Sequence, residues 1–362
     1  MIDYLIVGSG LFGCCFAEQA KKNKKSCMII EKRKHPFGNC YTERLDEIDV
    51  HKYGPHIFHT SSEMVWQYIN QFTEFNSYIN RPKVNYDGKI YSFPINLFTL
   101  YQLWGVTTPR EAKDRLEKEK IKINNPTNLE EWILSQVGEE IYYKFIYGYT
   151  KKQWNTDPKN LPTFIIKRLP IRLNFDDNYF NDKYQGIPSN GYSDMMHNMT
   201  DGIEILLEND YLKNREYWNS LAKTVVYTGA IDEFYDYEFG ILDYRSLRFE
   251  TTSIANCDFQ GNAIVNYTDE RVPFTRIVEH KHFSNRPNDN TIITKEYSQD
   301  WSVALDRFYP INNSKNNDLY EKYKTINHGS KFIFGGRLAE YKYYDMHQII
   351  GSSLHKYKEH NN

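Results

Sequence analysis

The pattern of apolar and polar positions at the start of the chain predicts a strand, a glycine-rich turn and a helix in immediate succession. Residues 1–7 (MIDYLIV) predict a short strand, and GSGLFG follows at residues 8–13. An apolar segment suited to a helix comes next, and residues 26–30 predict a second strand that leads into Glu31. Strand, glycines, helix, strand and acidic residue in this order are typical of a dinucleotide-binding βαβ unit.

Each part of this unit has a physical task in binding a dinucleotide. Gly8 permits the tight turn, Gly10 lets the backbone approach a pyrophosphate, and Gly13 lets the helix pack on the strand. The free N–H groups at the start of the helix face the phosphates. Glu31 can accept hydrogen bonds from the adenosine ribose. Glycines at this spacing also occur in ordinary turns, so the prediction depends on all the parts being in register.

The middle of the chain changes to a helical pattern. Residues 108–120 begin with Thr-Pro, which is typical of a helix start, and they predict a charged helix. Asn128 can cap a second helix, in which apolar residues keep roughly helical spacing as far as Phe145. Residues 96–175 are therefore predicted to form a mostly helical insertion.

The last part of the chain is predicted to be rich in strands. Residues 223–227 and 331–334 each predict a short strand, and residues 346–357 predict a helix. Residues 245–283 and 291–297 alternate in the manner of antiparallel strands. The dinucleotide-binding fold is therefore expected to be discontinuous, with its first strands at the N-terminus and its last strand and helix at the C-terminus.

Composition excludes several classes of function. A net charge of -2 argues against general nucleic-acid binding, which requires a basic face. The sequence has no run of 18 apolar residues and no charged leader before its first strand, so we expect neither membrane insertion nor a signal peptide. Five cysteines without a CxxC pair fit a reduced cytoplasm. The 30 tyrosines and 21 phenylalanines fit either a half-wet core or a wide cleft for a nucleotide or sugar.

Ten motifs taken in order resemble the bacterial UDP-galactopyranose mutases, a family of flavoenzymes, over essentially the whole chain. One departure is visible at Phe37-Gly38, where the family usually has two glycines beside the flavin, and this puts the shape of the pocket edge in doubt. The motifs are VGSGLFG, EKRKHPFGN, YGPHIFHT, YTKKQW, KRLPIR, DDNYF, YQGIPSNGY, TGAIDEF, PFTRIVEHKHF and GGRLAEYKYYDM.

The resemblance implies an isomerase that uses FAD without net oxidation. Such an enzyme interconverts UDP-galactopyranose and UDP-galactofuranose through an adduct between N5 of the reduced flavin and the anomeric carbon, for cell-surface polysaccharide synthesis. NADPH or NADH is the expected reductant, and a cytoplasmic homodimer is the expected form. The resemblance leaves open whether the N-acetylated sugar is also a substrate.

The resemblance also implies a fold in three parts. We expect an α/β protein with a Rossmann-like FAD-binding domain, a helical insertion and an antiparallel β-sheet domain for the substrate. The expected boundaries are 1–80, 205–240 and 315–362 for the FAD-binding domain, 81–178 for the helical insertion with its mobile substrate loop, and 179–204 and 241–314 for the sheet domain.

The residues expected to bind the cofactor come from the glycine turn, the acidic residue, the segment YGPHIFHT and the C-terminal motif. Arg337 is expected to favour the anionic reduced flavin, because a nearby cation stabilises negative charge. The expected cofactor-binding residues are Gly8, Gly10, Leu11, Phe12, Gly13, Glu31, Lys32, Asn39, His56, Ile57, Gly336, Arg337, Asp345 and Met346.

The substrate site is expected to combine cations with tyrosines. Arg168 and Arg276 match arginines that grip the diphosphate, which a planar guanidinium can hold in bidentate fashion. The loop around residues 154–175 is expected to close over UDP, carrying Arg168 inward and excluding water. Phe145 and Tyr149 are expected beside the uracil. The expected substrate-binding residues are Phe145, Tyr149, Trp154, Arg168, Tyr179, Arg276, Glu296, Tyr309 and Tyr343, and the expected catalytic residues are Arg168, Arg276, His56, His59 and Arg245.

Three other interpretations fit parts of the sequence. An FAD-dependent oxidoreductase of the amine-oxidase type would share the fold, but it gives no reason for paired phosphate-binding arginines far from the glycine turn. A nucleotide-binding module without turnover would retain the glycines and lose the flavin-facing arginine. His56 and His59 could resemble a metal pair, but no third ligand with suitable spacing is evident, and we expect no metal.

Overall fold

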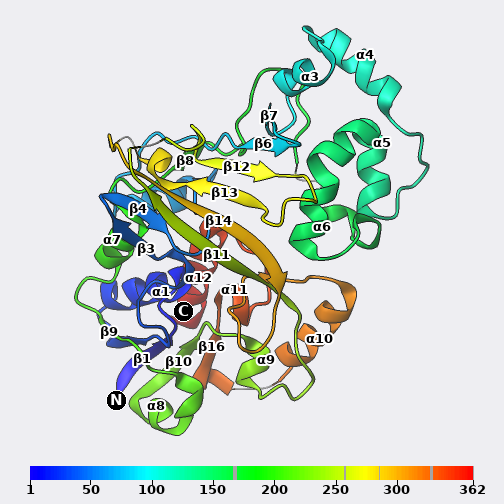
Figure 1. The fold of residues 1–362 in the computed structure, drawn as a ribbon. Helices are drawn as coiled ribbons and strands as arrows, with labels where there is room; N and C mark the ends of the chain where they lie inside the picture. The colour runs from blue at the N-terminus through cyan, green and yellow to red at the C-terminus, as the bar shows by residue number, and fades with distance from the viewer. Residues whose placement is uncertain (166–168, 257, 285, 327–328, 362) are drawn as a thin grey trace. The chain divides into compact units, whose positions relative to one another are not determined.

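The computed structural model describes the chain except residues 166–168, 257, 285, 327–328 and 362, and it divides the chain into two compact units whose elements are labelled in Figure 1. Each unit is discontinuous, because the chain leaves the first unit twice and returns to it. The first unit comprises Met1–Ser77, Asp182–Tyr244 and Arg307–Asn362, and the second comprises Tyr78–Asn181 and Arg245–Asp306.

A five-stranded parallel sheet forms the first unit and confirms the predicted dinucleotide-binding arrangement. The first strand pairs with the second on one side and with the strand over residues 222–227 on the other. Its residues Leu5 and Ile6 are fully buried, as in the near-continuous apolar strands of a covered parallel sheet. The strand order is β16 (Phe332–Phe334), β10 (Ala222–Tyr227), β1 (Ile2–Val7), β2 (Cys27–Ile30) and β9 (Glu204–Leu206).

The two ends of the chain meet in the first unit. α1 (Leu11–Lys22) follows the glycine turn, and α12 (Met346–Asn361) packs on it. The rings of Phe16 and Tyr357 meet edge to face at 5.2 Å between centroids, and the Ser353 hydroxyl donates to a carbonyl of α1 at 2.9 Å. The other helices of this unit are α2 (Glu63–Ile69), α7 (Gly191–Met199), α8 (Arg215–Leu221), α9 (Ile231–Phe234), α10 (Ser314–Lys324) and α11 (Gly336–Ala339).

Residues 32–60, for which no regular structure was predicted, contain three short strands. Two of them form an antiparallel hairpin whose turn residues Asp46 and Glu47 both have positive φ, 47° and 61°. Neither residue is Asn or Gly, so the usual sequence signal for such a turn is missing. The pairs are β3 (Thr42–Leu45) with β4 (Ile48–His51), and β5 (Phe58–Thr60) with β8 (Tyr184–Gly186); the unit also holds the two-residue strand β15 (Tyr309–Pro310).

The predicted helix starts in the second unit are confirmed. The Thr108 hydroxyl accepts from the Glu111 amide at 3.3 Å, and the Glu111 carboxylate accepts from the Thr108 amide at 3.1 Å, which is a reciprocal capping box. Asn128 caps the next helix through the Glu131 amide at 3.0 Å. The predicted helical spacing beyond residue 141 continues as a π-helical segment. The helices are α3 (Leu97–Trp104), α4 (Pro109–Glu119), α5 (Leu129–Ile141), the π-helix Tyr142–Tyr147 and α6 (Gly148–Trp154).

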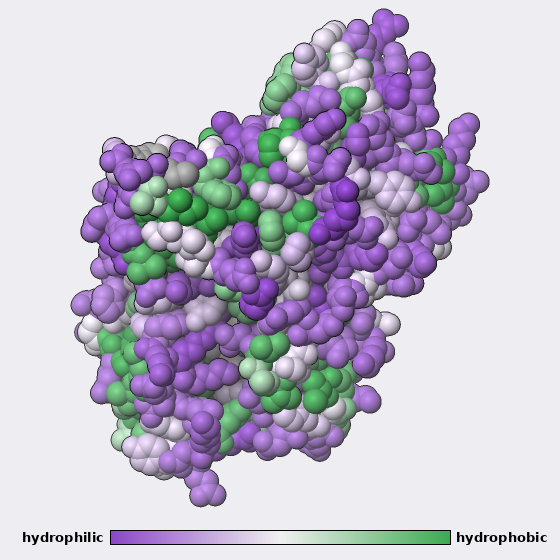
Figure 2. Space-filling view, in the orientation of Figure 1, coloured by the Kyte–Doolittle hydropathy of each residue, from purple (hydrophilic) through white to green (hydrophobic). Residues whose placement is uncertain are grey.

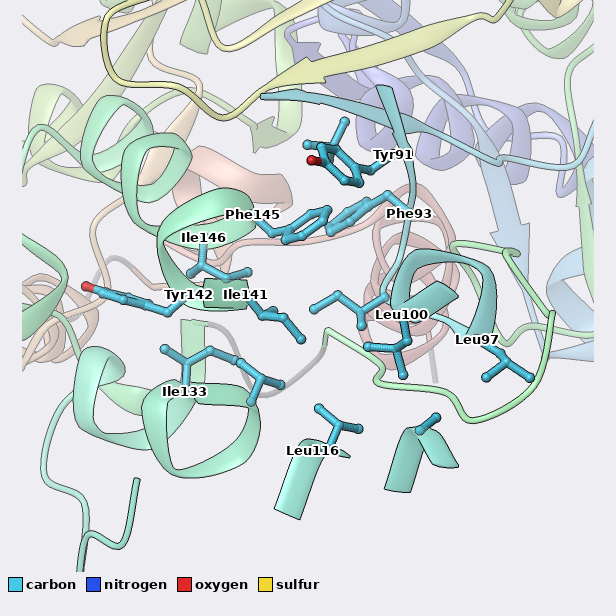
Figure 3. Packing of buried hydrophobic residues seen from close by; sticks show 14 of the residues in the cluster. Tyr91, Phe93, Leu97, Leu100, Leu116, Ile133, Ile141, Tyr142, Phe145 and Ile146 are labelled. Carbon is cyan, nitrogen blue, oxygen red and sulfur yellow. The ribbon is translucent and has the colours of Figure 1, made fainter. Parts of the chain in front are cut away.

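Apolar side chains from these helices form one buried cluster with the strand residues before them. Figure 3 shows the ring of Phe145 beside that of Phe93, with Leu100 and Ile141 in the same cluster. The Phe145 ring also meets Tyr91 edge to face at 5.3 Å. Burial of this apolar surface holds the helical region together.

The second unit also contains the antiparallel sheet that was predicted after residue 245. Its strands are mostly paired antiparallel, and the exception is the parallel pair β12 and β6. The strands of this unit follow one another in the sheet in the order β11 (Tyr244–Ile254), β14 (Thr291–Asp300), β13 (Arg276–Glu279), β12 (Ile264–Tyr267), β6 (Lys83–Tyr86) and β7 (Lys89–Ser92).

The structure replaces the three predicted domains with two units. Residues 182–204 belong to the first unit rather than to the sheet domain, because β8 pairs with β5 and α7 follows it. The predicted helical insertion, residues 81–178, and the sheet of residues 245–306 form a single unit, because β6 and β7 extend that sheet. Strand pairings between distant residues decide both boundaries, and local pattern does not reveal them.

None of the helices in the described part of the chain is both long and apolar enough to cross a bilayer. Figure 2 shows hydrophilic side chains over much of the visible face, with the hydrophobic ones in separate small groups. The prediction that the chain has no membrane-spanning helix therefore holds for these residues.

Candidate functional site

Two glycines of the predicted turn are required by the protein's own packing. Gly8 has φ +100°, and a Cβ atom there would lie 2.2 Å from Oγ1 of Thr228. A Cβ on Gly13 would lie 2.1 Å from the backbone oxygen of Gly8. Contacts this short are impossible, so the turn and the close approach of α1 to β1 explain both residues.

Gly10 is different, because no contact among the described residues requires it to be glycine. Its φ of -65° suits any residue, and an added Cβ would meet no heavy atom within 4 Å. α1 begins directly after it, without a side-chain cap and without an acidic residue in the first turn. An open backbone beside uncapped helix N–H groups fits a bound pyrophosphate, so the residues present fit a dinucleotide such as FAD. Leu11 and Phe12, which follow, are buried and present their backbone there.

Glu31 ties the glycine turn to the end of β2. One carboxylate oxygen accepts from the Ser9 amide at 3.0 Å and from the Ser9 hydroxyl at 2.8 Å, and the other accepts from the Arg33 amide at 3.0 Å. A carboxylate has about four acceptor sites, so capacity remains for the ribose hydroxyl that the sequence predicts. Lys32 is exposed, and Asn39 accepts from the Arg33 guanidinium at 3.0 Å.

Phe37, the departure from the family pattern, packs directly behind this turn. It is buried, its φ is +75°, and its amide donates to the Ser9 hydroxyl at 2.9 Å. Its ring meets His197 edge to face at 5.8 Å. The next residue, Gly38, lies so close that an added Cβ would be 3.1 Å from the Cα of Gly10. The large ring is therefore accommodated in the protein core at a backbone conformation that normally favours glycine.

The segment YGPHIFHT places its two histidines in different surroundings. Nδ1 of His56 lies 2.8 Å from the Gly54 carbonyl, and the His56 amide donates to Nδ1 of His51 at 3.0 Å. Burial lowers the pKa of His56 to about 4, and the positive charge of Arg337 adds to the shift. His56 is therefore a neutral imidazole at physiological pH. Ile57, between the two histidines, is buried.

Lowering the pKa of His56 makes the stability of the fold depend on pH. Below pH 6.5 the unfolded chain binds a proton that the folded His56 rejects, so stability falls as the pH falls. Between pH 7 and pH 5 we expect the unfolding free energy of the flavin-free wild type to drop by about 2 kcal/mol more than that of His56→Gln. Urea unfolding at the two pH values measures this difference, and parallel pH dependence of the two proteins would disprove it.

His59 is grouped with two residues at the start of α12. Its Nδ1 lies 2.7 Å from a carboxylate oxygen of Asp182, and its ring centroid lies 5.1 Å from that of His347. One ligand atom each from His59, Asp345 and His347 lie within 4.8 Å of one another. The sequence showed no third ligand for the histidine pair, because these residues are far apart in the chain. His59 already has a carboxylate partner in Asp182.

Three residues expected at the cofactor or the diphosphate gather at the C-terminal motif of the first unit. The rings of Tyr309 and Tyr343 stack at 5.2 Å, and the guanidinium carbon of Arg337 lies 6.0 and 5.6 Å from their centroids. Arg337 donates to the carbonyls of Phe308 and Tyr344 at 3.3 and 2.6 Å. Gly336 begins α11, and Met346 begins α12 after Asp345. The structure therefore places one cation and two phenolic hydroxyls in one cluster.

In the second unit, contacts with neighbouring residues fix the position of the Arg276 side chain. Arg276 and Glu296 are cross-strand partners on β13 and β14, with Nε of the arginine 3.1 Å from the carboxylate. An Nη atom of Arg276 donates to the Tyr149 hydroxyl at 3.0 Å. Glu296 is 1% exposed and Arg276 is 20% exposed. Burial raises the pKa of Glu296, and the guanidinium opposes that shift. Glu296 and Tyr149 therefore position Arg276, whose side chain is partly exposed.

Three other residues predicted for the site are packed among other residues of the protein. Arg245 is 2% exposed, and its guanidinium is bound to groups of the same unit. Phe145 is 2% exposed in the helical core, which leaves it little surface for a base. Tyr179 is partly buried against the same cluster. Trp154 ends α6, and Arg168 lies outside the described residues.

Comparison with known proteins identifies the family of the chain. The model of the UDP-galactopyranose mutase family matches residues 144–343, and that of NAD(P)-binding Rossmann-like domains matches residues 6–72. A probable UDP-galactopyranose mutase of Klebsiella pneumoniae is 42% identical over 97% of this chain and 93% of its own length. The chain belongs to the UDP-galactopyranose mutase family.

Members of this flavin-dependent isomerase family differ in the sugar nucleotide named for them. The dTDP-fucopyranose mutase of Escherichia coli is 40% identical over 98% of this chain and 97% of its own length. A solved structure of reduced UDP-galactopyranose mutase shares the fold, with a TM-score of 0.77 at 14% identity, over 99% of this chain and 95% of the other. Membership in an isomerase family confirms the predicted enzyme class over the oxidoreductase alternative.

Proposed function

We propose that the protein interconverts UDP-galactopyranose and UDP-galactofuranose, with reduced FAD as its cofactor. The observation that supports this most is Arg276, which pairs with the buried Glu296, donates to the Tyr149 hydroxyl and has a partly exposed side chain. A fixed planar cation of this kind suits a diphosphate. The chain that carries it has a glycine turn suited to a dinucleotide and belongs to a mutase family.

FAD would be held by the turn and the C-terminal motif of the first unit. The N–H groups that begin α1 and the open backbone at Gly10 suit its pyrophosphate, and Glu31 suits its ribose. When bound in its reduced form, the flavin supplies the nucleophile for the anomeric carbon of the sugar. Arg337 would stabilise negative charge on it. The remaining proposed contacts are Leu11, Phe12, Lys32, Asn39, His56, Ile57, Gly336, Asp345 and Met346.

The protein's own contribution is to bind, to orient and to stabilise charge. Arg276, positioned by Tyr149, would hold the diphosphate and stabilise the negative charge that grows on it as UDP departs. We assign the same role to Arg168, Tyr179, Tyr309 and Tyr343. His56, neutral at physiological pH, can accept or donate one hydrogen bond without adding a charge. Since the cofactor supplies the nucleophile, no triad of serine, histidine and acid is needed.

A second candidate is the same reaction on dTDP-fucopyranose, which the name of the Escherichia coli relative favours. The two substrates differ in the base, in the ribose 2′-hydroxyl and in the sugar 6-hydroxyl. The identities of 42% and 40% to the two relatives do not decide between the two substrates.

A comparison of kcat/KM for three furanose substrates tests the assignment. Reduced enzyme is given UDP-galactofuranose, dTDP-fucofuranose or N-acetylated UDP-galactofuranose, and the ring forms are separated by chromatography. We expect the highest kcat/KM for UDP-galactofuranose. A higher kcat/KM for the dTDP-sugar would transfer the assignment to the second candidate. NADPH or NADH as reductant, a cytoplasmic homodimer and a role in polysaccharide synthesis are part of the same proposal.

A further inference from the structure

The C-terminal end of α6 is fastened by side chains from two neighbouring strands. Nε of Arg245 on β11 donates to the Gln153 carbonyl at 2.9 Å, and the Ser298 hydroxyl on β14 donates to the same carbonyl at 2.7 Å. Asp300, at the end of β14, pairs with the guanidinium of Arg245 and accepts from the side-chain amide of Asn155 at 2.7 Å. We call Arg245, Ser298 and Asp300 the α6 latch.

The latch stabilises the C-terminal end of α6 electrostatically. The last carbonyls of an α-helix have no intrahelical partner, and they carry partial negative charge. The guanidinium of Arg245 supplies both a donor and a positive charge to one of them. Its own burial lowers the pKa of Arg245, and the Asp300 carboxylate opposes that shift. The guanidinium of Arg245 therefore stabilises the end of α6, and the Asp300 carboxylate stabilises the guanidinium.

The latch also completes the attachment of α6 to the sheet. At the start of the helix Tyr149 accepts from Arg276. In its middle the ammonium of Lys152 is surrounded by the carbonyls of Tyr267, Asp269, Val272 and Phe274, at 2.7 to 3.0 Å. At its end the chain turns into a left-handed conformation at Asn155, φ 48°. The latch contacts Gln153 and Asn155, the residues on either side of Trp154.

We propose that the α6 latch positions Trp154 and Tyr149 for the nucleotide sugar, and that Arg245 acts through α6 rather than by touching the substrate. The geometry supports this role, because the Arg245 side chain is 2% exposed and donates to Gln153, Ser298 and Asp300. The expected effect of the latch on catalysis rests on the proposed function. The expected effect of the latch on the backbone of α6 is independent of the proposed function.

Asp300→Asn tests the latch without removing a buried side chain, since the Asp300 side chain is 69% exposed. The amide keeps the size of the carboxylate but loses its charge and presents a donor to Asn155. Hydrogen exchange of the amides over residues 153–161 is measured in the intact protein. We expect exchange to speed up by about fivefold, the effect of losing one ion pair that stabilises a local structure. Unchanged exchange would overturn the proposal.

A matched control lies on the same two strands. Glu250 on β11 pairs with Arg248 and accepts from the Tyr297 hydroxyl on β14 at 2.7 Å, and both partners of its ion pair are about half exposed. Glu250→Gln makes the same chemical change without a link to α6. We expect its exchange over residues 153–161 to match that of the wild type. Equal acceleration in both variants would mean a general effect of lost charge and would also overturn the latch.

Steady-state kinetics separates positioning from direct chemistry. For Asp300→Asn we expect KM for the nucleotide sugar to rise about fivefold while kcat stays within about twofold, because only binding geometry is disturbed. A loss of kcat with unchanged KM would place Arg245 in the reaction itself. Should the wild type prove inactive on UDP-sugars, the exchange measurement still decides whether the latch exists.

Discussion

Replacing Arg276 by alanine is expected to cut turnover of UDP-galactofuranose by at least about a hundredfold, which is the usual cost of losing one fixed group that stabilises charge in the transition state. Two effects combine. The diphosphate loses a bidentate cation, and Glu296 loses the charge that balances it in a 1% exposed position. The measurement is kcat/KM of the reduced enzyme, with ring forms quantified by chromatography.

Flavin content separates this loss from a failure of the cofactor site. The glycine turn belongs to the first unit and Arg276 to the second, so Arg276→Ala is expected to retain FAD. Arg248→Ala is the matched control, because Arg248 is a half-exposed arginine on β11 of the same sheet. Glu296→Gln keeps the shape of the carboxylate and is expected to be milder. Near-normal turnover in Arg276→Ala would refute its assignment to the diphosphate.

Gly10→Ala is expected to weaken FAD binding, whereas Gly13→Ala is expected to destabilise the fold. At Gly10 a Cβ meets no protein atom, so the fold should tolerate it. We expect flavin binding to weaken at least about a hundredfold, or about 2.7 kcal/mol, because the methyl group occupies the approach to the pyrophosphate. Isothermal titration of the flavin-free protein with FAD measures this change.

At Gly13 the expected loss is of stability. The added Cβ would lie 2.1 Å from a backbone oxygen, and either α1 or β1 must move. Alanine favours the helix by about 1 kcal/mol over glycine, whereas overpacking of a core site costs up to about 3 kcal/mol, so the clash dominates. Urea unfolding of both flavin-free variants provides the comparison. A Gly10→Ala protein that binds FAD like the wild type would contradict the assignment of the turn.

Features encoded over a few residues were predictable from the sequence. The helix start at Thr108 and the cap at Asn128 depend on neighbours within one turn, the βαβ unit follows from a motif contained in about 30 consecutive residues, and the structure confirms all three. The hairpin at Asp46 and Glu47 was missed, because its positive φ angles are adopted without the Asn or Gly that usually signals them.

The site required information that lies outside any local pattern. The partnership of Arg276 and Glu296 depends on the register of β13 with β14, and Asp182 and His347 join His59 only in the folded chain. Resemblance to a family identified the residues but did not describe their surroundings. Arg245, expected among the catalytic residues, is a buried arginine bound to a helix end.

The proposed reaction is an isomerisation that requires a reduced cofactor and consumes no electrons. Enzyme reduced with dithionite under anaerobic conditions is given UDP-galactofuranose in large molar excess, and ring forms, flavin absorbance and remaining dithionite are followed together. We expect many turnovers per enzyme with the flavin still reduced and no further reductant consumed, and no conversion by the oxidised enzyme. Reductant or acceptor consumed in proportion to product, or equal activity of the oxidised enzyme, would contradict it.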